Sequence, residues 1–463
     1  MKRILVLGGG FAGLYAALEF ERRLGRDRDV EVTLVSRENF HLFTPMLHEV
    51  AASDLDLTHI VNPIRKLLRR VRLFVGSVER LDLAARHVIV SHGDEHHHHE
   101  LSYDHLVIAL GSITHFGSLA GLEGRALTMK TLGDAIFLRN HLIEALEEAD
   151  FECSAGVRDP LLTTVVTGGG FAGVETLAAI HDFVHEALVF YPHLEARQVR
   201  MVLVHSGPVI LPELGEKLGR YAQRKLAERG VELRLGTRVA SVGADGVTLA
   251  DGTRIPTRTL VWTAGSAPNP LLAELPCAKE RGRILVDSAM RVPGWPGVWA
   301  LGDCALVPDR HGGFCPPTAQ HALRQGKVLA RNVVAALCGA PPQPFAFSAL
   351  GQLAAIGKRT GVARILGINF SGFVAWWLWR TIYLAKLPRF EKKLRVMLDW
   401  SLDLVFSKDL VQFMTHRAKE AAHAGDVTNV LDPAPISAGP PMGEFPGAEA
   451  APNAVPSAPV AAG

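Results

Sequence analysis

Two short glycine-rich segments have the spacing that binds a dinucleotide. The sequence GGGFAG occurs at 8–13 and again at 168–173. Each copy follows a short apolar run, at 4–7 or 164–167, and precedes a helix-like stretch, at 14–23 or 174–187. Glycine in such a turn lets the backbone approach a pyrophosphate, and the following helix points its N-terminal amides at the negative charge. The repeat therefore predicts two dinucleotide sites, formed by Gly8, Gly10 and Gly13 and by Gly168, Gly170 and Gly173.

The residues at the end of the second strand of each unit determine which ribose is recognised. An acidic side chain normally stands there and binds the ribose hydroxyls. The first unit has Ser36, Arg37 and Glu38 at this place, and the second has His205 with no carboxylate beside it. Serine and histidine can hydrogen-bond a hydroxyl, and the missing charge removes the repulsion that would exclude a 2′-phosphate. We expect NADH as the preferred donor, and NADPH stays open as an alternative.

Two dinucleotide sites in one chain suggest hydride exchange between a nicotinamide and a flavin, which then reduces a second acceptor. Disulfide reductases relay electrons through a cysteine pair, but the five cysteines form no CxxC pair. Cys304 and Cys315 are more simply explained as packed thiols. The cysteine pattern argues against a disulfide scaffold or a zinc knuckle and favours a reducing compartment.

The elements that carry these residues alternate between strand and helix. Further strands are expected at 30–35, 106–110, 200–204, 260–263 and 298–301, and a helix at 319–337. This alternation predicts an α/β fold in which one doubly wound, Rossmann-like unit with a parallel sheet is used twice. The basic and apolar residues at 2–7 resemble the start of a secretory signal, but the run ends at Gly8, which favours a buried strand.

Composition narrows the class of protein. The 463 residues suggest about three folding units, and 48% hydrophobic against 21% charged residues exclude a mainly disordered or fibrous chain. Lysine and arginine (49) nearly balance aspartate and glutamate (47), so no strong positive field attracts nucleic acid. The histidines at 92 and 96–99 are interpreted as a solvated hairpin tip, and we predict no metal site.

The C-terminal part has a different character. Residues 365–379 carry no charge and include three tryptophans, but about 18 apolar residues are needed to span a membrane. Beyond them, Leu394, Met397, Leu398, Leu402 and Val405 follow a helical spacing. This pattern fits a helix lying in a membrane interface, and it equally fits a helix packed on the domain or on a second subunit. The segment 433–463 holds eight prolines and nine alanines, which predicts disorder.

Taken together, the motifs resemble those of type II NADH:quinone oxidoreductases, single-subunit NADH dehydrogenases of the respiratory chain that do not pump protons. The resemblance runs from about residue 2 to 416. It rests on GGGFAG, HLFTPMLHEVA (41–51), ALGS (109–112), GGGFAGVE (168–175), VWTAG (261–265), GVWALGD (297–303), PPTAQ (316–320), GQLAAIGKRTGVA (351–363) and SGFVAWWLWR (371–380).

This resemblance implies FAD as cofactor and a quinone as the final acceptor. It implies that Gly302 and Asp303 bind the ribityl chain and that Thr44 and Pro45 line the flavin. The implied cofactor-binding set is completed by Ala109, Gly111, Gly265 and Ala319. Two residues are implied to be catalytic: Glu175, near the contact between nicotinamide and flavin, and Gln320, which begins the AQxxxQ quinone element. Here Arg324 replaces the second glutamine, with Gln325 beside it.

The resemblance also implies an organisation in domains. We expect a split FAD-binding domain at 1–115 and 295–345, an inserted NAD(P)H-binding domain at 116–294, a membrane-association region at 346–424 and a disordered tail at 425–463. The protein would attach peripherally to the cytoplasmic face of the cell membrane through its C-terminal amphipathic helix. A homodimer is one candidate for the oligomeric state.

Two other functions stay open at this point. A sulfide:quinone oxidoreductase would need reactive cysteines beside the flavin, with Cys153 and Cys338 as candidates, although the intact second glycine motif argues against it. A regulatory flavoprotein that senses NADH would bleach on mixing with NADH but would not be reoxidised by a quinone.

Overall fold

The computed structural model describes residues 1–93, 95–117, 119, 121–403 and 405–413. The tail predicted at 425–463 and the last part of the predicted membrane-association region, 414–424, lie outside these residues.

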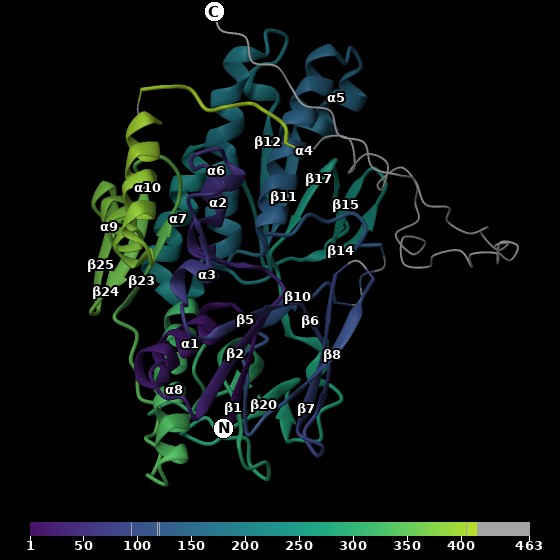
Figure 1. The fold of residues 1–463 in the computed structure, drawn as a ribbon. Helices are drawn as coiled ribbons and strands as arrows, with labels where there is room; N and C mark the ends of the chain where they lie inside the picture. The colour runs from purple at the N-terminus through teal and green to yellow at the C-terminus, as the bar shows by residue number, and fades with distance from the viewer. Residues whose placement is uncertain (94, 118, 120, 404, 414–463) are drawn as a thin grey trace, which may run out of the picture. The chain divides into compact units, whose positions relative to one another are not determined.

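The first glycine turn follows the central strand of a five-stranded parallel sheet (Figure 1). The strand order is β21 (Val298–Ala300), β9 (His105–Ile108), β1 (Lys2–Leu7), β2 (Val30–Ser36) and β5 (Arg72–Val75). Helix α1 (Phe11–Leu24) follows the turn and packs on α8 (Ala319–Leu337). The two helices approach closely because α8 carries Gly326 at the contact, where a Cβ would lie 2.4 Å from the Ala12 carbonyl oxygen.

The second glycine turn occupies the same place in a four-stranded parallel sheet. Its strand order is β13 (Glu232–Leu235), β12 (Arg200–His205), β11 (Thr163–Thr167) and β17 (Thr259–Trp262). Helix α6 (Phe171–Ala187) follows the turn, and α7 (Glu216–Glu228) lies between β12 and β13 in the chain. The predicted doubly wound units, with their strands and helices, are confirmed.

Smaller sheets extend the two parallel sheets. Beside the first are the antiparallel sheet of β6 (Ser77–Asp82), β7 (His87–His92) and β8 (His97–Ser102), the pair β3 (Phe40–Leu42) and β4 (Val61–Pro63), and the sheet of β19 (Lys279–Glu280), β20 (Arg283–Leu285) and β22 (Ala305–Leu306). In the second unit, β14 (Val239–Gly243), β15 (Gly246–Leu249) and β16 (Arg254–Pro256) form an antiparallel sheet. The predicted hairpin is confirmed as β7 and β8, but only His96 lies in its turn, because His92 ends β7 and the histidines at 97–99 begin β8. All five of these histidines are exposed, as predicted.

The chain crosses between the units on a two-stranded antiparallel ribbon. Strand β10 (Ser112–Thr114) leaves the first unit and pairs with β18 (Ser266–Pro268), which returns to it. Between them, α4 (Leu132–Phe151) and α5 (Ala155–Leu162) lead into β11. Leu272, Ile284 and Met290 belong to the hydrophobic cluster of the first sheet. Packing therefore favours a return to the first unit near β18, while the predicted boundary at residue 294 stays a prediction.

The C-terminal region packs on both units. Strands β23 (Gly351–Ala355), β24 (Gly361–Ile365) and β25 (Ile368–Gly372) form an antiparallel sheet next to α9 (Phe373–Lys386) and α10 (Phe390–Leu402) (Figure 1). Trp379 and Trp400 share a hydrophobic cluster with α2 (Leu47–Ala51), α4 and α6. None of the helices in the described ranges has the length and apolar character needed to cross a bilayer.

Helix α10 turns its apolar stripe outward. Leu394, Met397, Leu398 and Leu402 are about half exposed, while the buried residues of the helix are Lys392, Val396 and Trp400. Phe390, the first residue of α10, is also exposed, and neighbouring segments add five further exposed apolar residues: Leu366, Ile368, Phe373, Val374 and Trp377. We call these ten residues the exposed apolar surface.

Candidate functional site

The two glycine turns have almost the same geometry. Gly8 and Gly168 adopt φ values of +108° and +112°, which L-residues rarely reach. A Cβ on Gly13 or on Gly173 would lie 1.9 Å from the carbonyl oxygen of the first glycine of its own turn. These four positions therefore require glycine for the fold of the turn itself.

The third glycine of each turn has a different environment. A Cβ on Gly10 or Gly170 would meet no protein atom within 4 Å. Each residue caps the N-terminus of its helix, no side chain caps that helix, and no acidic residue lies in its first turn. Free amides, a favourable helix dipole and open space are what a pyrophosphate requires, so both turns fit a dinucleotide such as FAD or NADH.

The residues predicted to bind the flavin come together beside the first turn. The Ala109 carbonyl lies against Gly8, where a Cβ would be 2.3 Å from its oxygen, and a Cβ on Gly302 would be 3.1 Å from Ala12 of α1. Asp303 accepts a hydrogen bond from Ser112 Oγ at 2.9 Å. Strands distant in sequence thus bring the Asp303 carboxylate close to the N-terminus of α1.

Gln325 has a structural role that no sequence motif indicates. Its side chain is buried, and its Oε1 accepts the backbone N–H of Gly302 at 2.9 Å. It therefore supports the turn that presents Asp303. Because this amide is already engaged, Gln325 is poorly placed to replace the missing glutamine of the quinone element.

Ser36 and His205 lie directly beneath the middle glycines of the two turns. A Cβ on Gly9 would be 2.3 Å from Ser36 Oγ, and His205 Nδ1 accepts the N–H of Gly169 at 3.1 Å. Both side chains therefore support a turn, whatever they contact on a ribose. Arg37 and Glu38 are exposed just beyond Ser36.

Thr44 and Pro45 begin a short 3₁₀ helix, Thr44–Met46, before α2. The preceding Phe43 is buried, with its ring 5.9 Å from that of Phe11 on α1 and 6.2 Å from that of Tyr383 on α9. This packing holds the predicted flavin-lining segment between the first glycine turn and the C-terminal region.

The Glu175 side chain is hydrogen-bonded to the C-terminal region. Its Oε1 accepts hydrogen bonds from Trp379 Nε1 at 2.9 Å and from the Ala355 amide at 3.1 Å. Burial raises the pKa of the Glu175 carboxyl to about 8, and the nearby Glu49 adds to this effect. At neutral pH the group therefore holds a proton, and because Oε1 accepts two N–H donors, that proton resides on Oε2.

A second buried acid, Glu49, lies on α2, where the sequence pattern does not mark it as part of a site. Its Oε2 accepts a hydrogen bond from Trp400 Nε1 at 3.2 Å, and burial raises its pKa to about 8 against the opposing charge of Arg380. Both acids line a small pocket of about 40 Å³ that contains further carboxylates. Other residues around this pocket are His48, Asp54, Asp182, Trp376, Arg380 and Asp403.

Gln320 and Arg324 occupy successive turns at the start of α8. Gln320 Nε2 donates to the Gly351 carbonyl at 3.2 Å, which links the helix to the C-terminal sheet. Arg324 donates to the Gln320 carbonyl at 3.0 Å, and its guanidinium lies 4.0 Å from the centre of the Phe347 ring. Burial lowers the pKa of Arg324. A partly buried cation therefore stands where the family element has an amide.

Three of the five cysteines, including both candidates for the sulfide relay, are poorly suited to carry electrons beside Asp303. Cys304 is fully buried, and burial raises its thiol pKa to about 11. Cys338 lies just past the end of α8, about 20 Å along the helix from Gln325. Cys153 lies beyond α4, a helix about 30 Å long whose first turn is the end near Ser112. This placement disfavours the chemistry of a sulfide:quinone oxidoreductase.

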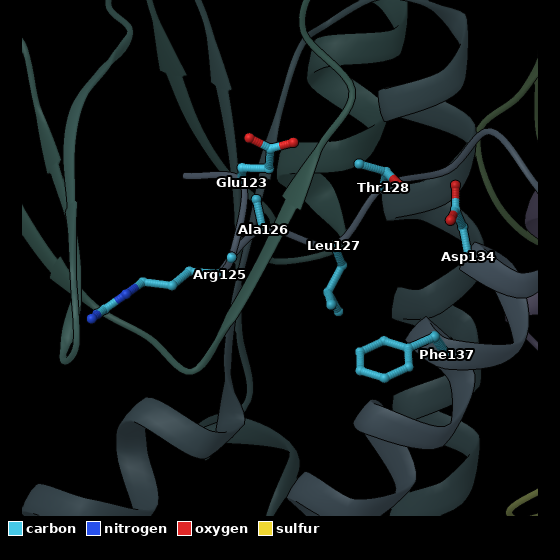
Figure 2. A pocket seen from close by; sticks show the side chains of 8 residues that line it. Glu123, Arg125, Ala126, Leu127, Thr128, Asp134 and Phe137 are labelled. Atoms are coloured by element: carbon cyan, nitrogen blue, oxygen red, sulfur yellow. The ribbon is translucent and has the colours of Figure 1, made fainter. Parts of the chain in front are cut away.

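A pocket of about 270 Å³ lies on the segment between residue 123 and α4 (Figure 2). Leu127 points toward the Phe137 ring, while Arg125 points away from it. None of the predicted site residues lines this pocket. The rings of His92 and His99 stack 4.7 Å apart on the β7–β8 hairpin, and within the described ranges no group of three or more potential ligands could hold a metal.

Comparison with known proteins covers nearly all of the described chain. A family model for pyridine nucleotide-disulphide oxidoreductases matches residues 2–326, and one for the NDH2 C-terminal domain matches residues 350–409. The chain is 33% identical over 426 residues to the type II NADH:quinone oxidoreductase Ndh of Mycobacterium tuberculosis, covering 88% of this chain and 89% of the relative. It is 28% identical to the type II NADH:quinone oxidoreductase of Staphylococcus aureus, covering 80% and 91%.

Solved structures agree on the fold. The structure of NDH2 from Plasmodium falciparum in complex with NADH matches with a TM-score of 0.82 at 19% identity, over 89% of this chain and 99% of that one. A sulfide:quinone oxidoreductase from Aquifex aeolicus matches with a TM-score of 0.66 at 17% identity, over 88% and 96%.

Proposed function

This chain belongs to the family of type II NADH:quinone oxidoreductases, and on that premise we propose how its own residues carry electrons from NADH to a quinone. When bound, FAD accepts a hydride from NADH and passes two electrons on to the quinone. The observation that best supports this function is the pair of matching glycine turns, in which the first and last glycines are required by the fold and Gly10 or Gly170, at the helix N-terminus, faces open space.

We assign the first turn to FAD and the second to the nicotinamide dinucleotide. Gly8, Gly10 and Gly13 would hold the FAD pyrophosphate at the N-terminus of α1, and Asp303 would accept a hydrogen bond from a ribityl hydroxyl. The other proposed FAD contacts are Ser36, Arg37, Glu38, Thr44, Pro45, Ala109, Gly111, Gly302 and Ala319. The proposed NADH contacts are Gly168, Gly170, Gly173, His205 and Gly265.

Glu175 is proposed to supply a proton to the quinone. Reduction of a quinone to a quinol consumes a proton in addition to the hydride equivalent. The Glu175 carboxyl is protonated at neutral pH because its pKa is about 8, and its free oxygen, Oε2, carries that proton. Glu49, which titrates in the same range and lines the same pocket, would return a proton to it.

Gln320 is the proposed quinone contact. It lies at the N-terminus of α8, the helix that also carries Gln325 beneath Gly302, so it stands between the flavin site and the C-terminal sheet. Arg324 lies one turn further along α8. It gives the proposed quinone site a positive charge that the family element lacks.

The exposed apolar surface is proposed to attach the protein peripherally to a membrane. Phe373, Trp377 and Phe390 are more than half exposed on elements that also carry Lys386 and Lys393, which suits the boundary between acyl chains and anionic headgroups. A lipid-dissolved quinone could then reach Gln320 without a membrane-spanning helix. Attachment to the cytoplasmic face, where NADH is available, and assembly as a homodimer stay predictions.

Stopped-flow mixing of the FAD-loaded protein with NADH, and then with a short-chain quinone, tests the function. We expect the flavin absorbance to bleach on mixing with NADH and to return on mixing with quinone. Bleaching without recovery would indicate the NADH sensor instead. Running the first step with NADPH measures the donor preference.

A further inference from the structure

Lys130 reaches the proposed flavin site from the segment that joins the two units. Its Nζ donates to Ser112 Oγ at 2.9 Å, and Ser112 Oγ donates to Asp303 Oδ2 at 2.9 Å. Ser112 and Asp303 close two of the glycine-containing motifs, whereas Lys130 belongs to none of them. A cation, a hydroxyl and a carboxylate thus form a continuous chain that ends at the proposed ribityl-binding group.

The side chain of Lys130 is partly removed from solvent. Burial lowers its pKa, against the opposing charges of Asp303 and Asp134. Ser112 takes one of its three N–H donors, and within the described chain we find no further hydrogen bond or ion pair of Nζ. Two donors therefore remain for an acceptor outside the protein.

The backbone fixes Lys130 from both sides. Its N–H donates to Asp134 Oδ2 at 2.8 Å, next to the capping box that Thr131 and Asp134 form at the start of α4. Three residues earlier, Leu127 is hydrogen-bonded to both Leu260 and Trp262 at the edge strand β17 of the second sheet. Ser112, the partner of the side chain, opens the β10–β18 ribbon. The chain Lys130–Ser112–Asp303 therefore lies where the two units are joined.

We propose that Lys130 is a positioning residue of the flavin site, which orients Asp303 through Ser112 and offers its remaining N–H groups to oxygen acceptors of FAD. The inference rests on the proposed function only in taking FAD as the ligand. Part of the FAD affinity of the first unit would then come from Lys130, which lies on the segment that leads from the first unit to the second.

The test compares FAD affinity of the refolded apoprotein, measured by quenching of flavin fluorescence, across matched variants. Lys130→Met keeps the approximate length of the side chain but removes its charge and its donors. It should weaken FAD binding about tenfold or more, because hydrogen bonds that involve a charged group are stronger than those between neutral groups. Lys130→Arg should restore affinity to within about threefold of the wild type, because it keeps the charge. Lys225→Met, on the exposed face of α7, should leave affinity unchanged.

Two further measurements separate positioning from general stability. In a Ser112→Ala background, the effect of Lys130→Met should shrink, because contacting residues of one network are not additive. The flavin midpoint potential of Lys130→Met should fall, because removal of a positive charge disfavours the more negative reduced flavin; a tenfold differential effect corresponds to about 30 mV.

Equal FAD affinity of Lys130→Met and wild type would overturn the inference. A second result would also overturn it: both Lys130→Met and Lys130→Arg bind FAD more weakly than the wild type, and both lower the melting temperature of the apoprotein by the same amount. Wild-type protein that binds no FAD would overturn this inference and the proposed function together. Protein that shows the Lys130 effect but does not reduce quinone would overturn only the proposed function.

Discussion

Replacement of Glu175 by glutamine should change the pH dependence of stability in a defined direction. Glutamine has the same shape, and its Oε1 can still accept the N–H groups of Trp379 and Ala355. The variant therefore differs from the wild type mainly in having no proton to lose. In the wild type, the carboxyl has a pKa of about 8 in the fold and 4.5 when unfolded.

The size of the effect follows from these two values. Because the folded state holds the proton more tightly, the wild type loses stability as pH rises from 4.5 to about 8, at about 1.4 kcal/mol for each pH unit. The whole window corresponds to at most about 5 kcal/mol. Glu175→Gln should therefore match the wild type near pH 4.5 and become more stable than it by several kcal/mol at pH 9.

Chemical denaturation at pH 5, 7 and 9 measures this difference as a shift between the transition midpoints of the two proteins. Glu228→Gln, an exposed acid on α7, is the matched control and should show no comparable trend. A stability difference between Glu175→Gln and the wild type that stays constant from pH 5 to 9 would refute the burial argument.

The same variant tests the proposed proton donor. Quinone-dependent recovery of the flavin absorbance should slow by about 10²-fold at pH 6, which is the lower end of the contribution of general acid catalysis. The wild-type rate should fall above pH 8 as the carboxyl ionises, whereas the variant should be slow and nearly independent of pH. An unchanged recovery rate would remove Glu175 from the mechanism.

Three other predictions test the flavin turn, the quinone passage and the membrane surface. Gly10→Ala should leave the melting temperature of the apoprotein unchanged but weaken FAD binding at least tenfold. Gly13→Ala should prevent the turn from folding, because its Cβ would lie 1.9 Å from a backbone oxygen. Equal thermal stability of the two apoproteins would contradict this prediction. Arg324→Gln should lower the KM for an apolar quinone by several-fold at unchanged KM for NADH, because it removes a partly buried charge from the proposed quinone site. An unaltered quinone KM would place Arg324 outside that site. Replacing Phe373 and Trp377 together by serine should reduce sedimentation of the protein with anionic vesicles at least tenfold, while activity with a water-soluble quinone persists. Loss of both vesicle binding and activity would indicate a folding defect instead.

Local signals predicted the elements around the glycine turns correctly. The predicted helix at 319–337 has the same bounds as α8, and the strands β1, β2, β11 and β12 lie where apolar runs precede or follow GGGFAG. These signals work because a strand, a tight turn and a helix N-terminus depend on neighbouring residues. The requirement for glycine at 8 and 168 is likewise a property of the local backbone.

The helix at 390–402 shows the limit of such signals. Its periodic apolar residues were equally consistent with packing on the domain, but the structure buries Lys392, Val396 and Trp400 instead. Helical periodicity identifies an apolar face without identifying what covers it. Only the position of α10 against α2 and α9 shows that this stripe faces outward.

Glycine spacing and strand–helix alternation act over about ten residues, so they predict the two dinucleotide-binding units and their order without knowledge of the fold. Only the tertiary structure brought Glu49 beside Glu175 and Lys130 beside Asp303, since each pair comes from elements far apart in the chain. Their protonation and their hydrogen bonds depend on burial and on partners from other elements. These properties arise only when the chain has folded, so no local pattern could encode them.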